Sequence, residues 1–203
     1  MKYIFVTGAP GSKWSSVVRN IYFSNSIDRT DNTPDRTYYK NGNLMHLGAY
    51  FDPGMEFGNE YILNMPTYDR ESLESEFDKP FSDSGVRIIK SHVFANHIDY
   101  IKETWPDCKL VLVYRSTDSS LGWWVRSGQF DITYPDYKPF YKDLENVARL
   151  IEEQNQGIMQ AWNRYPGFEP KNNVELCEYL GLSVPSIEYR QAYHEHDIAV
   201  KVI

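Results

Sequence analysis

Basic, hydroxyl and imidazole side chains follow two short apolar runs of this sequence, at the positions where strands would end. The segment PGSKWS (10–15) follows the run 2–7, and Lys90-Ser91-His92 closes the run 86–92. A glycine-rich turn that opens a helix offers free backbone N–H groups and the positive end of the helix dipole, which together bind phosphate-like groups. Lys90 and His92 share one face of their strand, and an imidazole can serve as a general base. The two segments predict a phosphate-binding loop beside a candidate base.

A third basic position lies at the end of the apolar run 109–115, which stops at Arg115. An arginine at the carboxyl end of a parallel strand faces the ligand crevice and binds an anion rather than a metal. Ser119 and Ser120 follow closely and offer hydroxyl donors. We therefore expect two separated anion-binding positions and no metal, as in a ligand that carries two phosphates.

A P-loop kinase is one alternative interpretation. Its phosphate loop, G-x-x-x-x-G-K-[ST], places six steps between the first glycine and the lysine. Here Gly8 and Lys13 are five steps apart, and Trp14 stands where serine or threonine is required. A kinase also needs a carboxylate for Mg²⁺, usually at the end of an apolar strand, and the obvious strand ends in Arg115 instead.

Four segments, taken in order, resemble the PAPS-dependent sulfotransferases. That family's 5′-phosphosulfate loop ends in a pattern like S-G-T-T-W, which reads PGSKW here, and its K-T-H triplet is matched by Lys90-Ser91-His92. Its 3′-phosphate segment resembles VLVYRSTDSSLGWW (111–124), and a late helix that often contains L-C-E-F-L-G resembles NNVELCEYLGL (172–182). These blocks span about half of the chain.

The resemblance implies transfer of a sulfuryl group from PAPS to a hydroxyl or amine, with PAP as the product. His92 would be the general base, while Lys90, Lys13 and the loop N–H groups would stabilise the leaving group. Arg115 would hold the 3′-phosphate, and Trp14 would stack on adenine. The implied contacts to PAPS are made by Pro10, Gly11, Ser12, Lys13, Trp14, Ser15, Arg115, Ser119 and Ser120.

Some positions depart from the family pattern. Ala9 stands where the family's loop often carries a lysine. The serine that usually helps to bind the 3′-phosphate aligns with Gly122, or with Trp123 if no gap is allowed. No R-K-G-like motif occurs near the C-terminus. These departures keep a second alternative open, a non-catalytic protein of the same fold that binds PAP or another nucleotide.

The surrounding pattern predicts an α/β fold, a three-layer sandwich with a central parallel sheet flanked by helices, in the P-loop-like architecture of sulfotransferases. Strands are expected at 2–7, 86–92 and 109–115, with a possible short strand at the C-terminus. The expected helices begin at Trp14 or cover 70–77, 94–105 (capped by Asn96), 119–128, 142–165 and 172–182. We expect one domain over 1–203.

The irregular, aromatic-rich region at about 25–85 is expected to form the substrate side of this domain. The candidate substrate-binding residues are His46, Tyr50, Phe51 and Phe57, although such rings also suit a minor core or a subunit interface. Trp123 and Trp124 are expected to pack in the core near the nucleotide.

Composition limits the partners. The net charge of −7 argues against a nucleic acid, whose backbone requires a basic surface, and leaves a small molecule or glycan as the acceptor. The two cysteines form no C-x-x-C pair, and no apolar run reaches membrane-spanning length. The expected location is the cytoplasm; the sequence does not indicate an oligomeric state.

Overall fold

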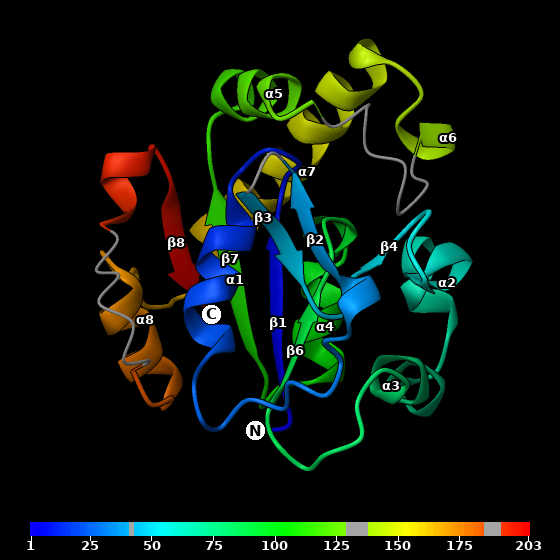
Figure 1. Ribbon diagram of the computed structural model, residues 1–203, viewed down its shortest axis with the longest axis vertical. Coiled ribbons are helices and arrows are strands. Elements are labelled where there is room, and N and C mark those ends of the chain that lie inside the picture. Colours follow the sequence, from blue (N-terminus) through cyan, green and yellow to red (C-terminus); the bar gives the residue numbers. More distant parts are fainter. Residues whose placement is uncertain (41–42, 129–137, 185–191) are drawn as a thin grey trace.

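A four-stranded sheet forms the centre of the protein (Figure 1). The computed structural model describes residues 1–40, 43–128, 138–184 and 192–203, with side chains for these except at 38–46. The strand order is β6-β1-β7-β8, with bounds Arg87–Lys90, Tyr3–Gly8, Lys109–Tyr114 and Ala199–Val202. β1 runs parallel to β6 and β7, whereas β8 is antiparallel to β7. The α/β class and the predicted strands are confirmed, and the antiparallel edge strand makes the sheet mostly parallel.

The central strand β1 is buried on both faces, as its unbroken apolar sequence predicts. Because side chains alternate along a strand, Ile4 and Val6 join one core while Tyr3 and Phe5 join the other. Helices must therefore cover both faces of the sheet.

One face is covered by α1 (Trp14–Tyr22) and α8 (Asn173–Leu180). The helix expected to begin at Trp14 is present, and its five apolar residues form one buried stripe: Trp14, Val17, Val18, Ile21 and Tyr22. The helix predicted over 172–182 is confirmed: the Asn172 side chain caps α8, and Gly181 ends that helix in the left-handed conformation.

The other face is covered by α3 (Arg70–Asp78), α4 (Ile98–Thr104) and the long helix α7 (Leu144–Arg164), which the Asp143 side chain caps. At the carboxyl ends of β1 and β7, α5 (Thr117–Arg126) packs against α7 (Figure 1). Ala9, from the turn after β1, lies in a small apolar cluster with Trp124 of α5. The turn is thereby fixed between the sheet and α5.

The predicted helix 94–105 is wrong at its start. A 3₁₀ turn occupies Val93–Asn96, and α4 begins only after His97, without a side-chain cap from Asn96. In this 3₁₀ turn three consecutive side chains, Val93, Phe94 and Ala95, are all buried in the core of the sheet. Packing has overridden the local capping signal here.

The region 25–85 is built from short elements joined by turns, with α3 near the predicted acidic helix. None of the other elements is long enough to show a hydrophobic period. The remaining elements of the fold are β2 (Thr37–Lys40), β3 (Asn43–Leu47), β4 (Phe51–Asp52), β5 (Phe57–Gly58), α2 (Asn59–Leu63), α6 (Lys138–Tyr141) and 3₁₀ turns at Pro34–Arg36, Met65–Thr67 and Tyr193–His196.

Candidate functional site

The loop between β1 and α1 turns sharply against α5. Gly11 has φ 79°, and a Cβ atom at this position would lie 2.0 Å from the carbonyl oxygen of Ser120. Ser12 is fully buried; its backbone N–H donates to the carbonyl of Ala9 at 3.0 Å, and its Oγ has no hydrogen-bond partner in the described part of the chain. Only glycine meets the conformation and the close approach required at position 11. The loop is therefore compact, and the Ser12 hydroxyl within it is available to bond a ligand.

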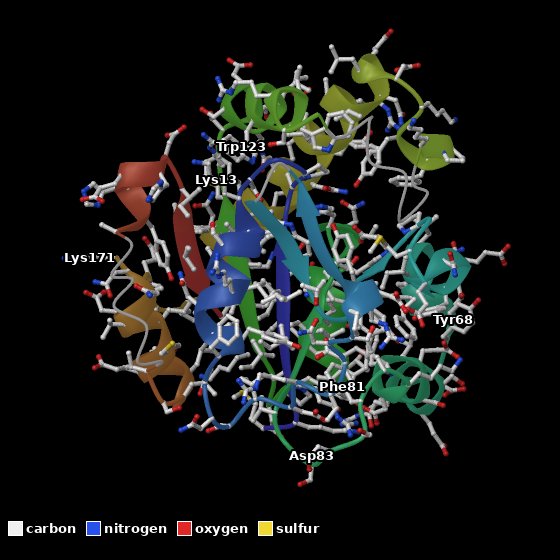
Figure 2. All side chains as sticks on the ribbon, in the orientation of Figure 1. Lys13, Tyr68, Phe81, Asp83, Trp123 and Lys171 are labelled. Atoms are coloured by element: carbon white, nitrogen blue, oxygen red, sulfur yellow. The ribbon has the colours of Figure 1, made fainter. Side chains whose placement is uncertain are left out.

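Lys13 occupies the N-cap position of α1 in the left-handed conformation, with φ 63°. Its Nζ lies 4.6 Å from the ring centroid of Trp123. Figure 2 shows Lys13 and Trp123 next to each other beside α5. The first N–H groups of an α-helix have no partner within the helix, so the start of α1 retains donors for an anion.

Three cations gather around this loop. Burial lowers the pKa of Lys13, and the charges of Arg115 and Arg126 lower it further. Burial also lowers the pKa of Arg115, while Asp197 partly opposes this effect. Cations that lower the pKa of a neighbouring cation favour the binding of an anion, which would relieve their repulsion.

Arg115 is held in place by the backbone around it. Its Nη1 donates to the carbonyl of Gly11 at 3.3 Å, and its own carbonyl accepts from Asn155 at 2.9 Å. The Ser120 hydroxyl also donates to this carbonyl, at 3.3 Å, and Ser120 is buried. The predicted grouping of Arg115 with the loop is present, but the Ser120 hydroxyl serves the backbone.

Asp197, which the sequence analysis missed, also contacts this site. Its Oδ2 accepts a hydrogen bond from Ser119 Oγ and lies 3.8 Å from Arg115 Nε. The carboxylate thus contacts two of the residues predicted to hold a 3′-phosphate. No local signal marks Asp197, because it lies 78 positions along the chain from Ser119 and reaches it only through the fold.

His92 lies directly beneath the loop. Its Nδ1 bonds the carbonyl oxygen of Gly8, which can only accept, so Nδ1 carries the proton and Nε2 is left with a lone pair. The imidazole is 7% exposed, with ring centroids 4.5 Å from Trp14 and 5.6 Å from Tyr50. Burial lowers the pKa of His92, so the ring is neutral at pH 7. This is the protonation state that a general base requires.

Asp52, at the end of β4, anchors the segment that carries His92. Its Oδ1 accepts from the Ser91 hydroxyl and from the backbone N–H of His92 at 3.0 Å. The Ser91 hydroxyl in turn accepts from Val93 N at 3.0 Å. Burial raises the pKa of Asp52. Nothing in the sequence singles out Asp52, because Asp52-Pro53-Gly54 has the composition of an ordinary turn.

Lys90 is placed differently from its predicted partners. Its ammonium donates to the carbonyl of Leu47 and lies 5.9 Å from the ring centroid of Tyr22. The nearby carboxylate of Asp31 accepts from the Tyr22 hydroxyl at 2.7 Å and from Ala49 N at 2.7 Å. Burial lowers the pKa of Lys90 to about 8. The amine therefore ties β6 to β3 on the α1 side of the sheet.

Trp14 and Trp123, which both lie next to the loop, differ in exposure from what the sequence predicts: the ring expected to stack on adenine is buried, and a ring expected in the core is exposed. Trp14 is only 5% exposed and packs on His92 and on Tyr50, whose ring centroid is 5.3 Å away. Trp123 is 36% exposed, contrary to the expectation that it packs in the core, whereas Trp124 is buried as expected. Trp123 is the ring beside Lys13 that a planar ligand can reach.

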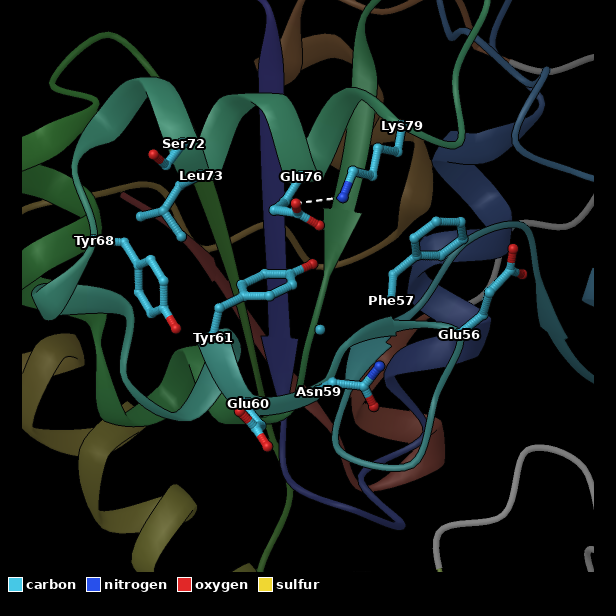
Figure 3. Close-up of a pocket in the computed structure, with 11 residues that line it drawn as sticks. Glu56, Phe57, Asn59, Glu60, Tyr61, Tyr68, Ser72, Leu73, Glu76 and Lys79 are labelled. Carbon is cyan, nitrogen blue, oxygen red and sulfur yellow. Dashed lines mark hydrogen bonds and ion pairs between the residues drawn. The ribbon is translucent and has the colours of Figure 1, made fainter.

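The predicted substrate residues do not gather in one place. Tyr50 packs beside His92, whereas Phe51 is fully buried with its ring centroid 5.5 Å from that of Phe77. Phe57 lines a 610 Å³ pocket between α2 and α3, in which the Tyr61 side chain lies centrally (Figure 3). None of the loop residues 8–13 lines this pocket. The side chain of His46 lies outside the described residues.

The chain resembles no characterised protein closely enough for a match: protein-family models, curated proteins and solved structures all gave none. Within the described ranges, no helix is long and apolar enough to cross a membrane, and no three His, Cys, Asp or Glu side chains are grouped to hold a metal ion. The interpretation of the site therefore depends on its own geometry.

Proposed function

We propose that this protein transfers a sulfuryl group from PAPS to a hydroxyl or amine acceptor and releases PAP. The observation that carries the proposal is the position of His92. Its Nδ1 proton is held by the Gly8 carbonyl at the start of the loop, so its neutral ring lies beside the loop around which Lys13, Arg115 and Arg126 gather. A base beside an anion-binding loop suits transfer of an anionic group to a protonated acceptor.

Binding of the nucleotide is assigned to the loop and to α5. The backbone N–H groups at the start of α1, with Ser12 and Lys13, would hold the 5′-phosphosulfate. Arg115 and Ser119 would hold the 3′-phosphate, because a guanidinium can bind two phosphate oxygens at once. We assign adenine stacking to Trp123 rather than to Trp14, because Trp123 is the exposed ring.

In the proposed reaction, Nε2 of His92 accepts the proton that the acceptor loses. PAPS supplies the sulfuryl group and a phosphate leaving group. Lys13 and the loop N–H groups stabilise the charge that grows on the leaving oxygen. Lys90 is left out of this role because its ammonium bonds Leu47, and Asp52 acts by positioning the backbone of His92.

A non-catalytic protein that binds PAP or another nucleotide is the second candidate. The limited exposure of His92 favours it, since an acceptor must reach Nε2 between Trp14 and Tyr50. A P-loop kinase has less support, because β7 runs into Arg115 where a metal-binding carboxylate is needed.

The two cysteines are unpaired, which suits the reducing cytoplasm.

The test is to measure PAP release from PAPS with a phenol, a sugar and an amine offered as separate acceptors. Wild type should turn over at least one acceptor, and His92→Asn should lose roughly 100-fold or more of the rate while still binding PAP. His194→Asn, which alters an exposed histidine, is the matched control and should keep full activity. Binding of PAP without turnover in wild type on every acceptor would favour the non-catalytic candidate.

A further inference from the structure

The carboxylate of Asp197 lies where the proposed function requires a phosphate. Oδ2 accepts from Ser119 Oγ and is 3.8 Å from Arg115 Nε. That Nε atom is buried and makes no hydrogen bond among the described residues, and Arg115 as a whole is 7% exposed. A buried guanidinium nitrogen without a hydrogen bond is costly, so this position retains a donor for a stronger anion.

The surrounding charges also indicate an incompletely satisfied anion subsite. Arg115 has Arg126 and Lys13 as cationic neighbours, and Asp197 is the acidic side chain that offsets them. The Asp197 side chain is 66% exposed, so its ion pair with Arg115 is largely hydrated and worth little. A phosphate monoester carries more charge than a carboxylate. Phosphate and sulfate monoesters both offer three terminal acceptor oxygens, which can bond several donors at the same time.

The segment around Asp197 would let the carboxylate leave without unfolding. Asp197 follows the 3₁₀ turn Tyr193–His196 with φ 56°, and its N–H donates to His194 at 3.2 Å. Tyr193 and Ile198 on either side are buried in the core on the α1 face. The backbone is anchored on both sides, so a change of side-chain rotamer is enough to open the subsite.

We propose that Arg115 and Ser119 form an anion subsite whose resting occupant is Asp197, and that Asp197 thereby determines how tightly a phosphate or sulfate monoester group binds there. The geometry itself requires only the anion; that the anion is the 3′-phosphate of PAPS rests on the proposed function. Asp197 is a specificity-determining residue in this account, because the ligand group must outcompete its carboxylate.

The test compares wild type, Asp197→Asn and Glu195→Gln by calorimetric titration with inorganic phosphate and, separately, with PAP. Asn accepts the hydrogen bond from Ser119 and tolerates a positive φ, so Asp197→Asn removes the charge with little strain. Glu195→Gln removes an equal charge from the same turn, where the Glu195 side chain is exposed. We expect Asp197→Asn to bind phosphate roughly 3- to 10-fold more tightly than wild type, and Glu195→Gln to be unchanged.

A third variant locates the effect. Arg115→Gln combined with Asp197→Asn should bind phosphate no better than wild type, because the subsite has lost its guanidinium. The proposal is overturned if Asp197→Asn leaves phosphate affinity unchanged, if Glu195→Gln tightens it equally, or if no variant binds phosphate. If Asp197→Asn tightens phosphate as expected but PAP binds no better than phosphate, the subsite stands and the nucleotide function fails.

Discussion

The ring centroids of Trp14 and His92 lie 4.5 Å apart, with 42° between the ring planes. The first helical residue after the loop thus packs directly on the candidate base. Tyr50 completes the contact from the segment between β3 and β4. Any change in the loop that moves Trp14 therefore also moves His92, and the loop and the base form one structural unit.

The pH dependence of turnover should follow His92. Burial lowers its pKa below the usual value of 6.5, and a general base acts only when it is neutral. We expect kcat/KM to stay level as pH falls through 6.5 and to decline only at lower pH. A rate profile measured from pH 4.5 to 8 tests this, with circular dichroism at each pH to exclude unfolding. A decline that begins above pH 7 would contradict the assignment of His92 as the base.

Gly11→Ala should disrupt the loop. The positive φ and the 2.0 Å approach to the Ser120 carbonyl together predict a loss of roughly 2–4 kcal/mol in unfolding free energy. Gly122→Ala in α5 is the matched control, because nothing lies within 4 Å of its added Cβ. That change should stabilise by up to about 1 kcal/mol. Denaturant unfolding of both variants measures the contrast, and equal effects would contradict the packing of the loop on α5.

Trp123→Ala should weaken nucleotide binding. Stacking of a base on an aromatic ring contributes about 1–3 kcal/mol, so we expect the Kd for PAP to rise about 5- to 150-fold with little change in stability. Val125→Ala removes an exposed apolar side chain from the same helix and should leave the Kd unchanged. An unchanged Kd in Trp123→Ala would return the stacking role to Trp14 or to a residue outside this helix.

Lys90 should make stability depend on pH in the alkaline range. Its pKa is about 8 in the folded protein against an ordinary 10.5, so the unfolded chain holds more protons between these values. The contribution of Lys90 to the free energy of unfolding therefore rises as the pH increases from about 8 to 10.5. Between pH 7.5 and 9.5 the unfolding free energy of wild type minus that of Lys90→Met should rise by about 1–2 kcal/mol. Parallel curves for the two proteins would contradict the burial of this amine.

Much of the fold could be predicted because its main strands and helices have continuous apolar runs or apolar periods in the sequence. The apolar strands β1, β6 and β7 and the stripe of α1 are set by burial, which leaves a period in the sequence. The predicted start of the helix that contains α4 is wrong because the burial of Val93, Phe94 and Ala95 depends on distant residues and overrode a local cap. The region 25–85 has elements too short to carry a period.

The site was predictable only in part. The loop, His92 and Arg115 stand at the ends of strands, where chain order brings them together. Asp52 and Asp197 reach the site through turns, and nothing near either residue in the sequence signals that contact. The adjacent residues Trp123 and Trp124 project about 100° apart on a helix, so they meet different surroundings, and here Trp124 alone of the two is buried. The sequence pattern of α5 does not indicate which of the two tryptophans is buried.

The central claim, that the loop and Arg115 bind the two phosphates of PAP, is tested most directly by thermal unfolding. Wild type and Arg115→Gln would be heated alone, with PAP, and with ATP plus Mg²⁺. At one hundred times its Kd a ligand adds about 2.7 kcal/mol, which should raise the Tm of wild type by roughly 5–10 °C with PAP alone. Arg115→Gln should lose most of this shift. A shift with ATP and Mg²⁺ but none with PAP would contradict the account and favour a kinase.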